Sequence, residues 1–405
     1  MQSWKKPNLF KFNNSEVFKS KQLSLFDSKS QKIQKILRKN DSLKLYVCGI
    51  TPYDSAHLGH AFTYLTFDSI IRVLNFIGQN TTYVQNVTDL DDPLFERARK
   101  INKPWREIVE EQVQVYRNDM SALNVIPPDY FVGVEENIDL VISEIESINN
   151  YSYQLNEKTY FKKQKNLNSS LVSDKSNEEL LQMASERGCD VSTIGKIDPL
   201  DPILWRSSSE DEPSWQTNFG SGRPGWHIQC ISLAQKYLNL PFDIQGGGND
   251  LIYPHHSMCD EITKITKNKD FAEIYCHVGM VSYEGSKMSK SKGNLVFVHQ
   301  LIDQGINPLV IRLLLISKPW HQDWEFIFAE IDHYKKTFNN LTKCAQKYIK
   351  LNDFENILKL ILNNLDFSSA IEYVLNVEKF DEKDDLISLE LVMNNLFGLS
   401  FNDAN

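Results

Sequence analysis

The sequence predicts an α/β protein whose core is a parallel β-sheet. Two apolar, β-branched runs, at 43–50 and 81–88, are separated by a stretch whose apolar residues recur at helical spacing. A strand, a helix and a strand of this length form a crossover unit, which places both strands parallel in one sheet. The pattern resumes at 242–281, and the chain from residue 309 onward is almost entirely helical in pattern. A parallel sheet interrupted by an insertion and followed by a helical bundle explains this order.

The first unit begins with the run LKLYVCGI at 43–50, where Gly49 leads into a turn marked by Pro52 and Asp54. A helix follows to about Gly78, which is a natural helix stop. Helices are expected next over 94–150, with an interruption at Pro127-Pro128, followed by a Tyr-rich hairpin at 151–161. A strand at 242–244 then runs into Gly246-Gly247-Gly248. A helix from Pro254 to residue 267 and a strand at 275–281 complete this part. No further strand is expected after residue 309.

Length and composition support a chain of several domains. The 405 residues, 41% hydrophobic and 24% charged, are enough to bury a sizeable core in two or three domains. We expect five segments: an N-terminal extension (1–42), the first half of the core (43–125), an insertion (126–210), the second half of the core (211–300) and a C-terminal helical domain (301–405).

Cysteine usage and hydropathy indicate the compartment. The six cysteines are scattered without CxxC pairs, which is too sparse for a disulfide framework and fits a reducing environment. No apolar run reaches membrane-spanning length, and Lys5 and Lys6 interrupt the opening residues. We therefore expect a cytoplasmic protein without a membrane partner.

Charge is distributed unevenly along the chain, whose net charge is -9. Residues 1–50 carry eleven Lys or Arg against three Asp or Glu, whereas 351–405 carry three Lys against eleven Asp or Glu. Binding of nucleic acid requires cationic contacts to phosphates, which the acidic C-terminal region lacks. A solvated acidic helical face is the better interpretation, and no nucleic-acid partner is expected.

The segment His57-Leu58-Gly59-His60 directly follows the first predicted strand and opens a helix. The N-terminus of a helix binds phosphate through free N–H groups, a glycine permits close approach of a ligand, and imidazoles add hydrogen bonds. On its own this HxGH motif is a weak signal, and two histidines that cap a helix are its more common explanation.

A second motif, Lys287-Met288-Ser289-Lys290-Ser291, lies in a basic loop between a strand and a helical region. Alone it could be a solvated turn. After an HxGH motif and at a domain-scale distance from it, two lysines on a loop can neutralise a leaving pyrophosphate without a Walker loop. The two motifs together resemble the catalytic core of class I aminoacyl-tRNA synthetases, and thus imply a Rossmann-like fold.

Longer blocks refine this resemblance. YVCGITPYD, GWHIQC, GGGNDLIYPHH and KMSKSKGN, spread over roughly 43–325, are similar to cysteinyl-tRNA synthetases and to the related mycothiol-pathway cysteine ligases. The opening MQSW and the block NVTDLDDPLF favour the ligase family, whose ERGGDP segment is matched only partly by ERGCDV at 186–191. The short, acidic region after the second motif agrees, because an aminosugar acceptor needs no anticodon-binding domain.

The resemblance implies a zinc site formed by Cys48, Cys230 and His255, which are too far apart in the sequence for spacing alone to indicate one. Zn²⁺ binds a thiolate far better than a hydroxyl, so an open coordination position would select cysteine over serine. Where the synthetases have a glutamate ligand, this chain has Cys259, either a fourth ligand or a small core residue. His256 is interpreted as structural or as facing the adenylate.

The resemblance also implies contacts to the adenylate and a pair of catalytic lysines. Lys290 is the first candidate for stabilising charge on the pyrophosphate, Lys287 the second, and His57 and His60 complete the catalytic set. The expected adenylate contacts are Cys48, Gly49, Ile50, Thr51, Thr63, Asn86, Val87, Thr88, Trp226, Gly248, Asn249, Asp250 and Val281.

The implied reaction is AMP-forming ligation of L-cysteine to the amine of 1D-myo-inositol 2-amino-2-deoxy-α-D-glucopyranoside, or glucosaminyl-inositol. It would proceed through a cysteinyl-adenylate, with ATP and Mg²⁺, in a monomer that carries one zinc ion. Two alternatives stay open: a cysteinyl-tRNA synthetase, and a synthetase-like binding protein without catalysis.

Overall fold

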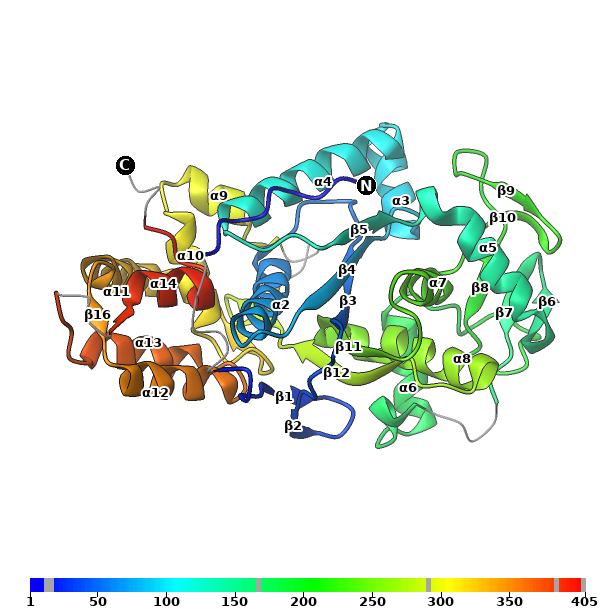
Figure 1. The fold of residues 1–405 in the computed structure, drawn as a ribbon. Helices are drawn as coiled ribbons and strands as arrows, with labels where there is room; N and C mark the ends of the chain where they lie inside the picture. Colours follow the sequence, from blue (N-terminus) through cyan, green and yellow to red (C-terminus); the bar gives the residue numbers. More distant parts are fainter. Residues whose placement is uncertain (11–17, 165–168, 289–292, 382–385, 402–405) are drawn as a thin grey trace.

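The structure is a computed structural model that describes residues 1–10, 18–164, 169–288, 293–381 and 386–401. Within these residues, five parallel strands form the central sheet in the order β12-β11-β3-β4-β5 (Figure 1). They are β3 (Leu43–Ile50), β4 (Thr81–Val87), β5 (Tyr130–Gly133), β11 (Phe242–Gly248) and β12 (Ala272–Val278). The predicted α/β fold with a parallel sheet is confirmed.

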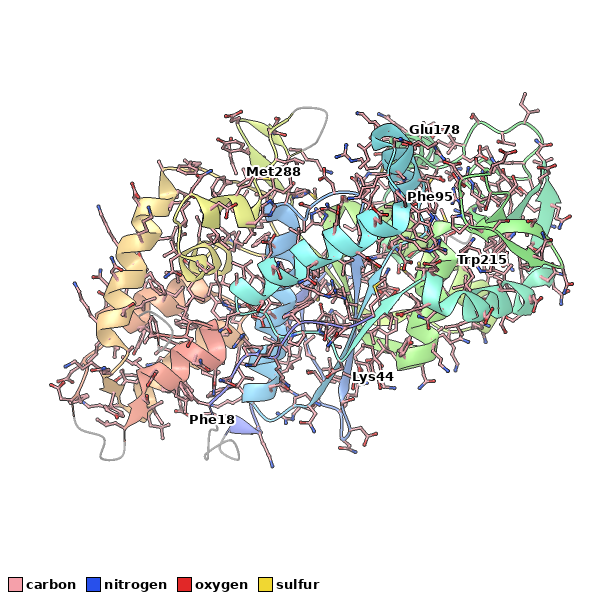
Figure 2. All side chains as sticks on the ribbon, turned by 90° about the horizontal axis from the view of Figure 1, so that it is seen from above. Phe18, Lys44, Phe95, Glu178, Trp215 and Met288 are labelled. Carbon is pink, nitrogen blue, oxygen red and sulfur yellow. The ribbon has the colours of Figure 1, made fainter. Side chains whose placement is uncertain are left out.

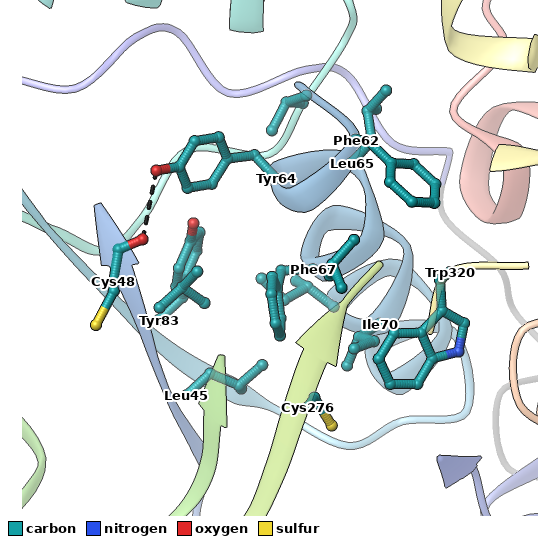
Figure 3. Packing of buried hydrophobic residues seen from close by; sticks show 14 of the residues in the cluster. Leu45, Cys48, Phe62, Tyr64, Leu65, Phe67, Ile70, Tyr83, Cys276 and Trp320 are labelled. Atoms are coloured by element: carbon teal, nitrogen blue, oxygen red, sulfur yellow. Dashed lines mark hydrogen bonds between the residues drawn. The ribbon is translucent and has the colours of Figure 1, made fainter. Parts of the chain in front are cut away.

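Helices cover both faces of this sheet, α2 (Leu58–Phe76) on one and α7 (Trp226–Leu238) on the other (Figure 1). Figure 3 shows the packing between α2 and the strands, where Phe67 lies over the sheet close to Leu45. The Tyr64 hydroxyl donates a hydrogen bond of 3.3 Å to the Cys48 carbonyl oxygen, which fixes the end of β3 to α2 (Figure 3). Burial of large apolar side chains on both faces is the main stabilising contribution to such a core.

The segment 94–150 departs from the predicted run of helices. It contains α3 (Asp92–Ile101), α4 (Trp105–Ala122) and α5 (Ile138–Ser147), but β5 lies between α4 and α5. The expectation of helix alone was therefore wrong at Tyr130–Gly133. Four residues are too few to display a strand period, and pairing with β4, far away in the sequence, determines their conformation.

The insertion forms a second sheet, mixed with short helices, in the order β6-β7-β8-β10-β9. The Tyr-rich hairpin is confirmed as β6 and β7, which pair antiparallel. The strands of this sheet are β6 (Ser152–Leu155), β7 (Lys158–Phe161), β8 (Ile203–Arg206), β9 (Trp215–Thr217) and β10 (Gly220–Pro224), and α6 (Asn177–Glu186) accompanies them. β9 and β10 lie after residue 210, and the division of the chain into five segments stays a prediction.

After β11 the chain passes through two short helical turns, Asn249–Leu251 and Ile252–His256, into α8 (Ser257–Lys267). Beyond β12, the strands β13 (Val281–Tyr283), β14 (Ser286–Lys287) and β15 (Trp324–Glu325) form a small sheet.

The C-terminal part is helical, as predicted, with two small additions. Its helices are α9 (Val298–Asp303), α10 (Pro308–Ile316), α11 (Glu330–Cys344), α12 (Leu351–Leu362), α13 (Phe367–Asn376) and α14 (Leu389–Val392). The expectation of no further strand was wrong, because β15 joins the small sheet and β16 (Tyr348–Ile349) pairs with β17 (Ile387–Ser388). These two-residue pairings leave no pattern in the sequence. No helix in the described parts of the chain has the length and apolar character needed to cross a membrane.

The N-terminal residues lie on the core. Trp4 donates its indole N–H to the Val125 carbonyl at 2.8 Å, and the hairpin of β1 (Ser24–Asp27) and β2 (Lys32–Lys35) lies beside β12. The Asp27 carboxylate accepts the Tyr275 N–H at 3.0 Å, which joins this hairpin to the edge of the central sheet.

A buried ionic cluster joins α2 to the C-terminal helices. Asp68 accepts hydrogen bonds from Arg72 at 2.8 Å and from Arg312 of α10, and all three side chains are fully buried. The guanidinium of Arg72 also donates to the Asn394 carbonyl at 3.0 Å, and that of Arg312 to the Phe397 carbonyl at 2.6 Å. Each charge is thus paired and hydrogen-bonded, as burial requires.

Candidate active site and metal centre

A cavity of about 520 Å³ opens where the carboxyl ends of β3 and β11 meet. Such ends of neighbouring parallel strands, contributed by different halves of the fold, are the usual ligand site of open α/β sheets. Most of the predicted site residues line it: Cys48, Gly49, Ile50, Thr51, His57, His60, Thr63, Thr88, Trp226, Cys230, Gly248, Asp250, His255, Val281 and Lys287. Asn86, Val87 and Asn249 are not among its lining residues, and Lys290 lies outside the described residues.

The three predicted metal ligands come together at the base of this cavity. The ligand atoms of Cys48, Cys230 and His255 all lie within 4.8 Å of one another, and all three residues are buried. The two sulfur atoms are 3.9 Å apart, and His255 Nε2 lies 3.2 Å from Cys230 Sγ. One ligand comes from β3, one from α7 and one from the turn before α8, so the sheet register and two helices fix their positions.

The surroundings shift the pKa values of the two thiols in opposite directions. The hydrogen bond from Cys48 lowers the pKa of Cys230 well below its usual range, and the nearby His255 acts in the same direction. Burial raises the pKa of Cys48, so this thiol remains the donor of the pair. A divalent cation would allow both sulfurs to be thiolates, because its charge compensates two negative groups that cannot both ionise without it.

Histidines behind the sulfurs form a set that the sequence motifs did not reveal. His256 Nε2 lies 3.1 Å from Cys48 Sγ, and its Nδ1 lies 2.7 Å from His277 Nε2. Burial lowers the pKa of His256 well below its usual range, so the ring is neutral. The interpretation of His256 as structural or facing the adenylate is therefore refined: it contacts a predicted ligand and orients it.

A second group of possible ligands shares His255. His227, His255 and Cys259 place one ligand atom each within 4.8 Å of the others. His227 Nδ1 lies 3.2 Å from His255 Nδ1, and the Cys259 thiol lies 3.6 Å from the His227 carbonyl. Cys259 thus groups with His227 and not with the two cavity cysteines. His227 could have been suspected from sequence, because it precedes Cys230 by three residues and i,i+3 positions share a helix face.

The HxGH segment forms the N-terminus of α2. His57 is the N-cap residue: its Nδ1 accepts the Gly59 N–H at 3.0 Å, while the His57 N–H donates to His60 Nδ1 at 3.2 Å. A Cβ on Gly59 would lie 2.8 Å from the His57 ring, so this glycine makes room for the capping histidine. The two readings of the motif are compatible, since both histidines cap the helix and both line the cavity.

Gly49 lines the cavity at the end of β3, and Asn86 of β4 lies behind it. A Cβ on Gly49 would lie 1.4 Å from the Asn86 carbonyl oxygen, so only glycine allows β3 and β4 to approach here. The Asn86 amide oxygen accepts the Gly49 N–H at 3.0 Å, and its amide group donates to Thr88 at 3.0 Å. Asn86 therefore supports residues that line the cavity.

Polar groups on the opposite side come from the helical turn after β11 and from β14. Lys287 Nζ lies 3.8 Å from an Asp250 carboxylate oxygen, at the entrance of the cavity. Trp226 stacks on His255, with ring centroids 4.3 Å apart and an interplanar angle of 17°. Met288, labelled in Figure 2 next to the grey trace, is the last described residue before 289–292.

The fold and the site together define a class I synthetase type of nucleotide-binding domain. The architecture resembles methionyl-tRNA synthetase of Mycobacterium tuberculosis in complex with methionyl-adenylate, with a TM-score of 0.61 and 14% identity over 82% of this chain and 81% of that one. A leucyl-tRNA synthetase of Agrobacterium radiobacter, in a ternary complex, gives a TM-score of 0.57 at 10% identity over 88% of this chain and 82% of that one. At these identities the likeness concerns the fold.

Sequence comparison then gives the family. Residues 34–336 match the model of the catalytic domain of class I (C) tRNA synthetases, and the chain belongs to this family. An L-cysteine:1D-myo-inositol 2-amino-2-deoxy-alpha-D-glucopyranoside ligase of Acidothermus cellulolyticus is 43% identical over 305 residues, 75% of each chain. The protein of the same name from Gordonia bronchialis is 43% identical over 330 residues, 80% of this chain and 79% of the relative.

Proposed function

We propose that this protein is an ATP-dependent, AMP-forming ligase that activates L-cysteine and transfers it to the amine of glucosaminyl-inositol. The observation that carries the proposal is the grouping of Cys48, Cys230 and His255 at the base of the cavity that the HxGH helix also lines. That grouping puts a site suited to a thiol beside one suited to phosphates. The names of the curated relatives, about 43% identical over most of the chain, supply the acceptor.

The three buried residues fit a zinc ion. Two sulfurs and one imidazole nitrogen are ligands that Zn²⁺ prefers, and three protein ligands leave one position open, as in catalytic zinc sites. When bound, the ion supplies a coordination position that takes the thiol of cysteine and not the hydroxyl of serine. His256, buried and neutral beside Cys48 Sγ, holds that ligand in place. Cys259 is not included in the set.

In the first half-reaction, the cysteine carboxylate attacks the α-phosphorus of ATP, the bond to the β-phosphate oxygen breaks, and pyrophosphate leaves. The N–H groups of Leu58, Gly59 and His60 already have acceptors within the protein, so the helix dipole at the start of α2 and the imidazoles of His57 and His60 are what favours the phosphates here. Lys287 at the entrance and Lys290 stabilise negative charge on the leaving pyrophosphate, with Mg²⁺ as the usual partner of ATP. The Asp250 carboxylate accepts a hydrogen bond from the cysteine ammonium or from a ribose hydroxyl.

Residues at the carboxyl ends of β3 and β4, on α2 and on α7 orient the adenylate. Gly49, Ile50 and Thr51 present backbone to the ligand, Thr63 and Thr88 offer hydroxyls, and Trp226 closes the side next to His255. Gly248 and Val281 complete the wall. Asn86, Val87 and Asn249 do not line the cavity and would support the residues that do. Asn86 does so by accepting the hydrogen bond from the Gly49 N–H.

Two assays test the proposal in sequence. ATP–pyrophosphate exchange should depend on cysteine and be negligible with serine at equal concentration; absence of exchange in zinc-loaded protein would favour a non-catalytic protein. Single-turnover transfer from preformed cysteinyl-adenylate should then yield the amide and AMP with glucosaminyl-inositol. Transfer only to tRNA would instead identify a cysteinyl-tRNA synthetase.

A further inference from the structure

Next to the adenylate cavity lies a second chamber of about 700 Å³, between α3 and the insertion. The two cavities share Thr51, Tyr53 and Trp226 as lining residues, so they are separated by a single layer of side chains. Pro93 and Glu96 of α3 and Ala184 of α6 are among the residues that line the chamber, and Figure 2 labels these two helices at Phe95 and Glu178. A volume of this size is within the usual range for pockets that enclose a small molecule.

The charges that line the chamber are balanced and largely paired. Lys158 contacts Asp190 at 2.9 Å, and Arg206 contacts Asp92 at 2.6 Å. Arg223 contacts Asp92 and also Glu212, the latter at 2.8 Å. Cations that are already neutralised by carboxylates give no net attraction for a polyphosphate strand. The chamber therefore suits a small polar molecule without phosphate groups.

Two groups in the chamber call for such a ligand. Tyr253 is only 1% exposed, and its hydroxyl has no hydrogen-bond partner within the described part of the chain. A buried hydroxyl without a partner is costly, and a ligand hydroxyl would satisfy it. Asp91 lies at the border with the adenylate cavity, where one carboxylate oxygen is 3.4 Å from the Thr51 hydroxyl and the other accepts the Asp92 N–H at 3.0 Å.

On the basis of the proposed function, we infer that this chamber binds the polyhydroxylated amine acceptor and that Asp91 receives its ammonium group. The carboxylate takes one proton from the ammonium, and the freed lone pair forms the C–N bond to the carbonyl carbon of the cysteinyl-adenylate. The bond from that carbon to the phosphate oxygen breaks, its electron pair leaves with AMP, and water takes the second proton from nitrogen. Tyr253 binds a ring hydroxyl of the same acceptor.

The surroundings of Asp91 suit this role. Burial raises the pKa of Asp91 to about 6, the neighbouring Asp92 adds to this, and Arg223 of β10 opposes it. Glu96 of α3 and Arg206 of β8 also line the chamber, with Lys158, Arg187, Asp190, Lys196 and Asp201 from the insertion. A carboxyl group with this pKa is ionised at neutral pH, and it is a stronger base than an exposed aspartate.

Asp91→Asn is the decisive substitution, because asparagine caps α3 as well as aspartate does and only the charge is lost. We expect cysteine-dependent ATP–pyrophosphate exchange to stay within about twofold of wild type, while kcat/KM for glucosaminyl-inositol falls at least about tenfold. In wild type, this kcat/KM should fall as pH drops below about 6. The kcat/KM of the variant should not show this decrease. Glu110→Gln on α4, outside both cavities, removes the same charge and should change neither step.

Tyr253→Phe gives an independent readout, since it should raise the acceptor KM and leave exchange intact. The inference is overturned if Asp91→Asn and Tyr253→Phe both transfer cysteine to the acceptor at wild-type kcat/KM. Loss of exchange in the wild-type protein would instead refute the proposed function, and transfer to tRNA alone would refute the acceptor assignment. If Asp91→Asn does not fold, a wild-type acceptor KM in Tyr253→Phe is sufficient to refute the chamber as the acceptor-binding site.

Discussion

Removing the sulfur of Cys230 should abolish metal binding and cysteine activation together. This atom lies between the other two ligands, 3.9 Å from Cys48 Sγ and 3.2 Å from His255 Nε2, so Cys230→Ala leaves only two donors. Loss of an outer partner of a ligand usually costs about 10- to 100-fold in metal affinity or activity. Loss of the ligand itself should exceed this, so we expect zinc affinity and kcat/KM for cysteine to fall by more than about 100-fold.

The structure supplies matched comparisons for this experiment. His256→Gln removes the neutral imidazole next to Cys48 Sγ and should cost about 10- to 100-fold, with zinc still bound at saturating metal. Cys344→Ala deletes a half-buried thiol on α11, remote from the cavity, and should change neither quantity. Metal content by mass spectrometry and ATP–pyrophosphate exchange with cysteine and serine are the assays. A zinc-free Cys230→Ala protein with full cysteine activation would refute the metal's assigned role.

Three further predictions concern other parts of the molecule. Lys290→Ala should retain zinc and slow ATP–pyrophosphate exchange, and an unchanged exchange rate would remove Lys290 from the catalytic set. Asp68→Asn should lower the free energy of unfolding by about 3–5 kcal/mol, because two buried guanidinium groups lose their counter-charge; a loss below about 1 kcal/mol in urea denaturation would contradict this. Burial lowers the pKa of His277 to about 3, so the unfolded chain binds more protons below about pH 6.5 and stability should fall as pH drops from there. His277→Asn should flatten this pH dependence in the same denaturation assay, and an unaltered slope would speak against it.

Much of the fold could be predicted because its strands and helices are long and locally patterned. β3, α2 and β4 were readable from their periodicity, and the hairpin of β6 and β7 from its composition. β5, β16 and β17 were not, because two to four residues carry no period and their pairing partners are distant in the sequence. Tertiary contacts determine such segments, and local pattern does not record them.

The candidate site, too, could be predicted only in part from the sequence. Cys48, Cys230 and His255 are separated by up to 207 residues, so only resemblance to a family, and not spacing, could group them. Of the nearby histidines, His277 belongs to no motif that was recognised, and His227 lies in the block GWHIQC but received no role from the sequence. Gly59 lines the cavity, and the sequence did not show that the absence of a side chain there also makes room for the ring of His57.

The buried cluster on α2 has a consequence for how the polypeptide is made. Asp68, Arg72 and Arg312 are fully enclosed, and the carbonyl groups of Asn394 and Phe397 complete their hydrogen bonding. During synthesis, the helix that opens with His57 must therefore await a segment translated more than 300 residues later before the hydrogen bonding of its buried Arg72 is complete. Ribosome-bound chains lacking residues 386–401 should thus remain chaperone clients, although every residue of the adenylate cavity has already emerged.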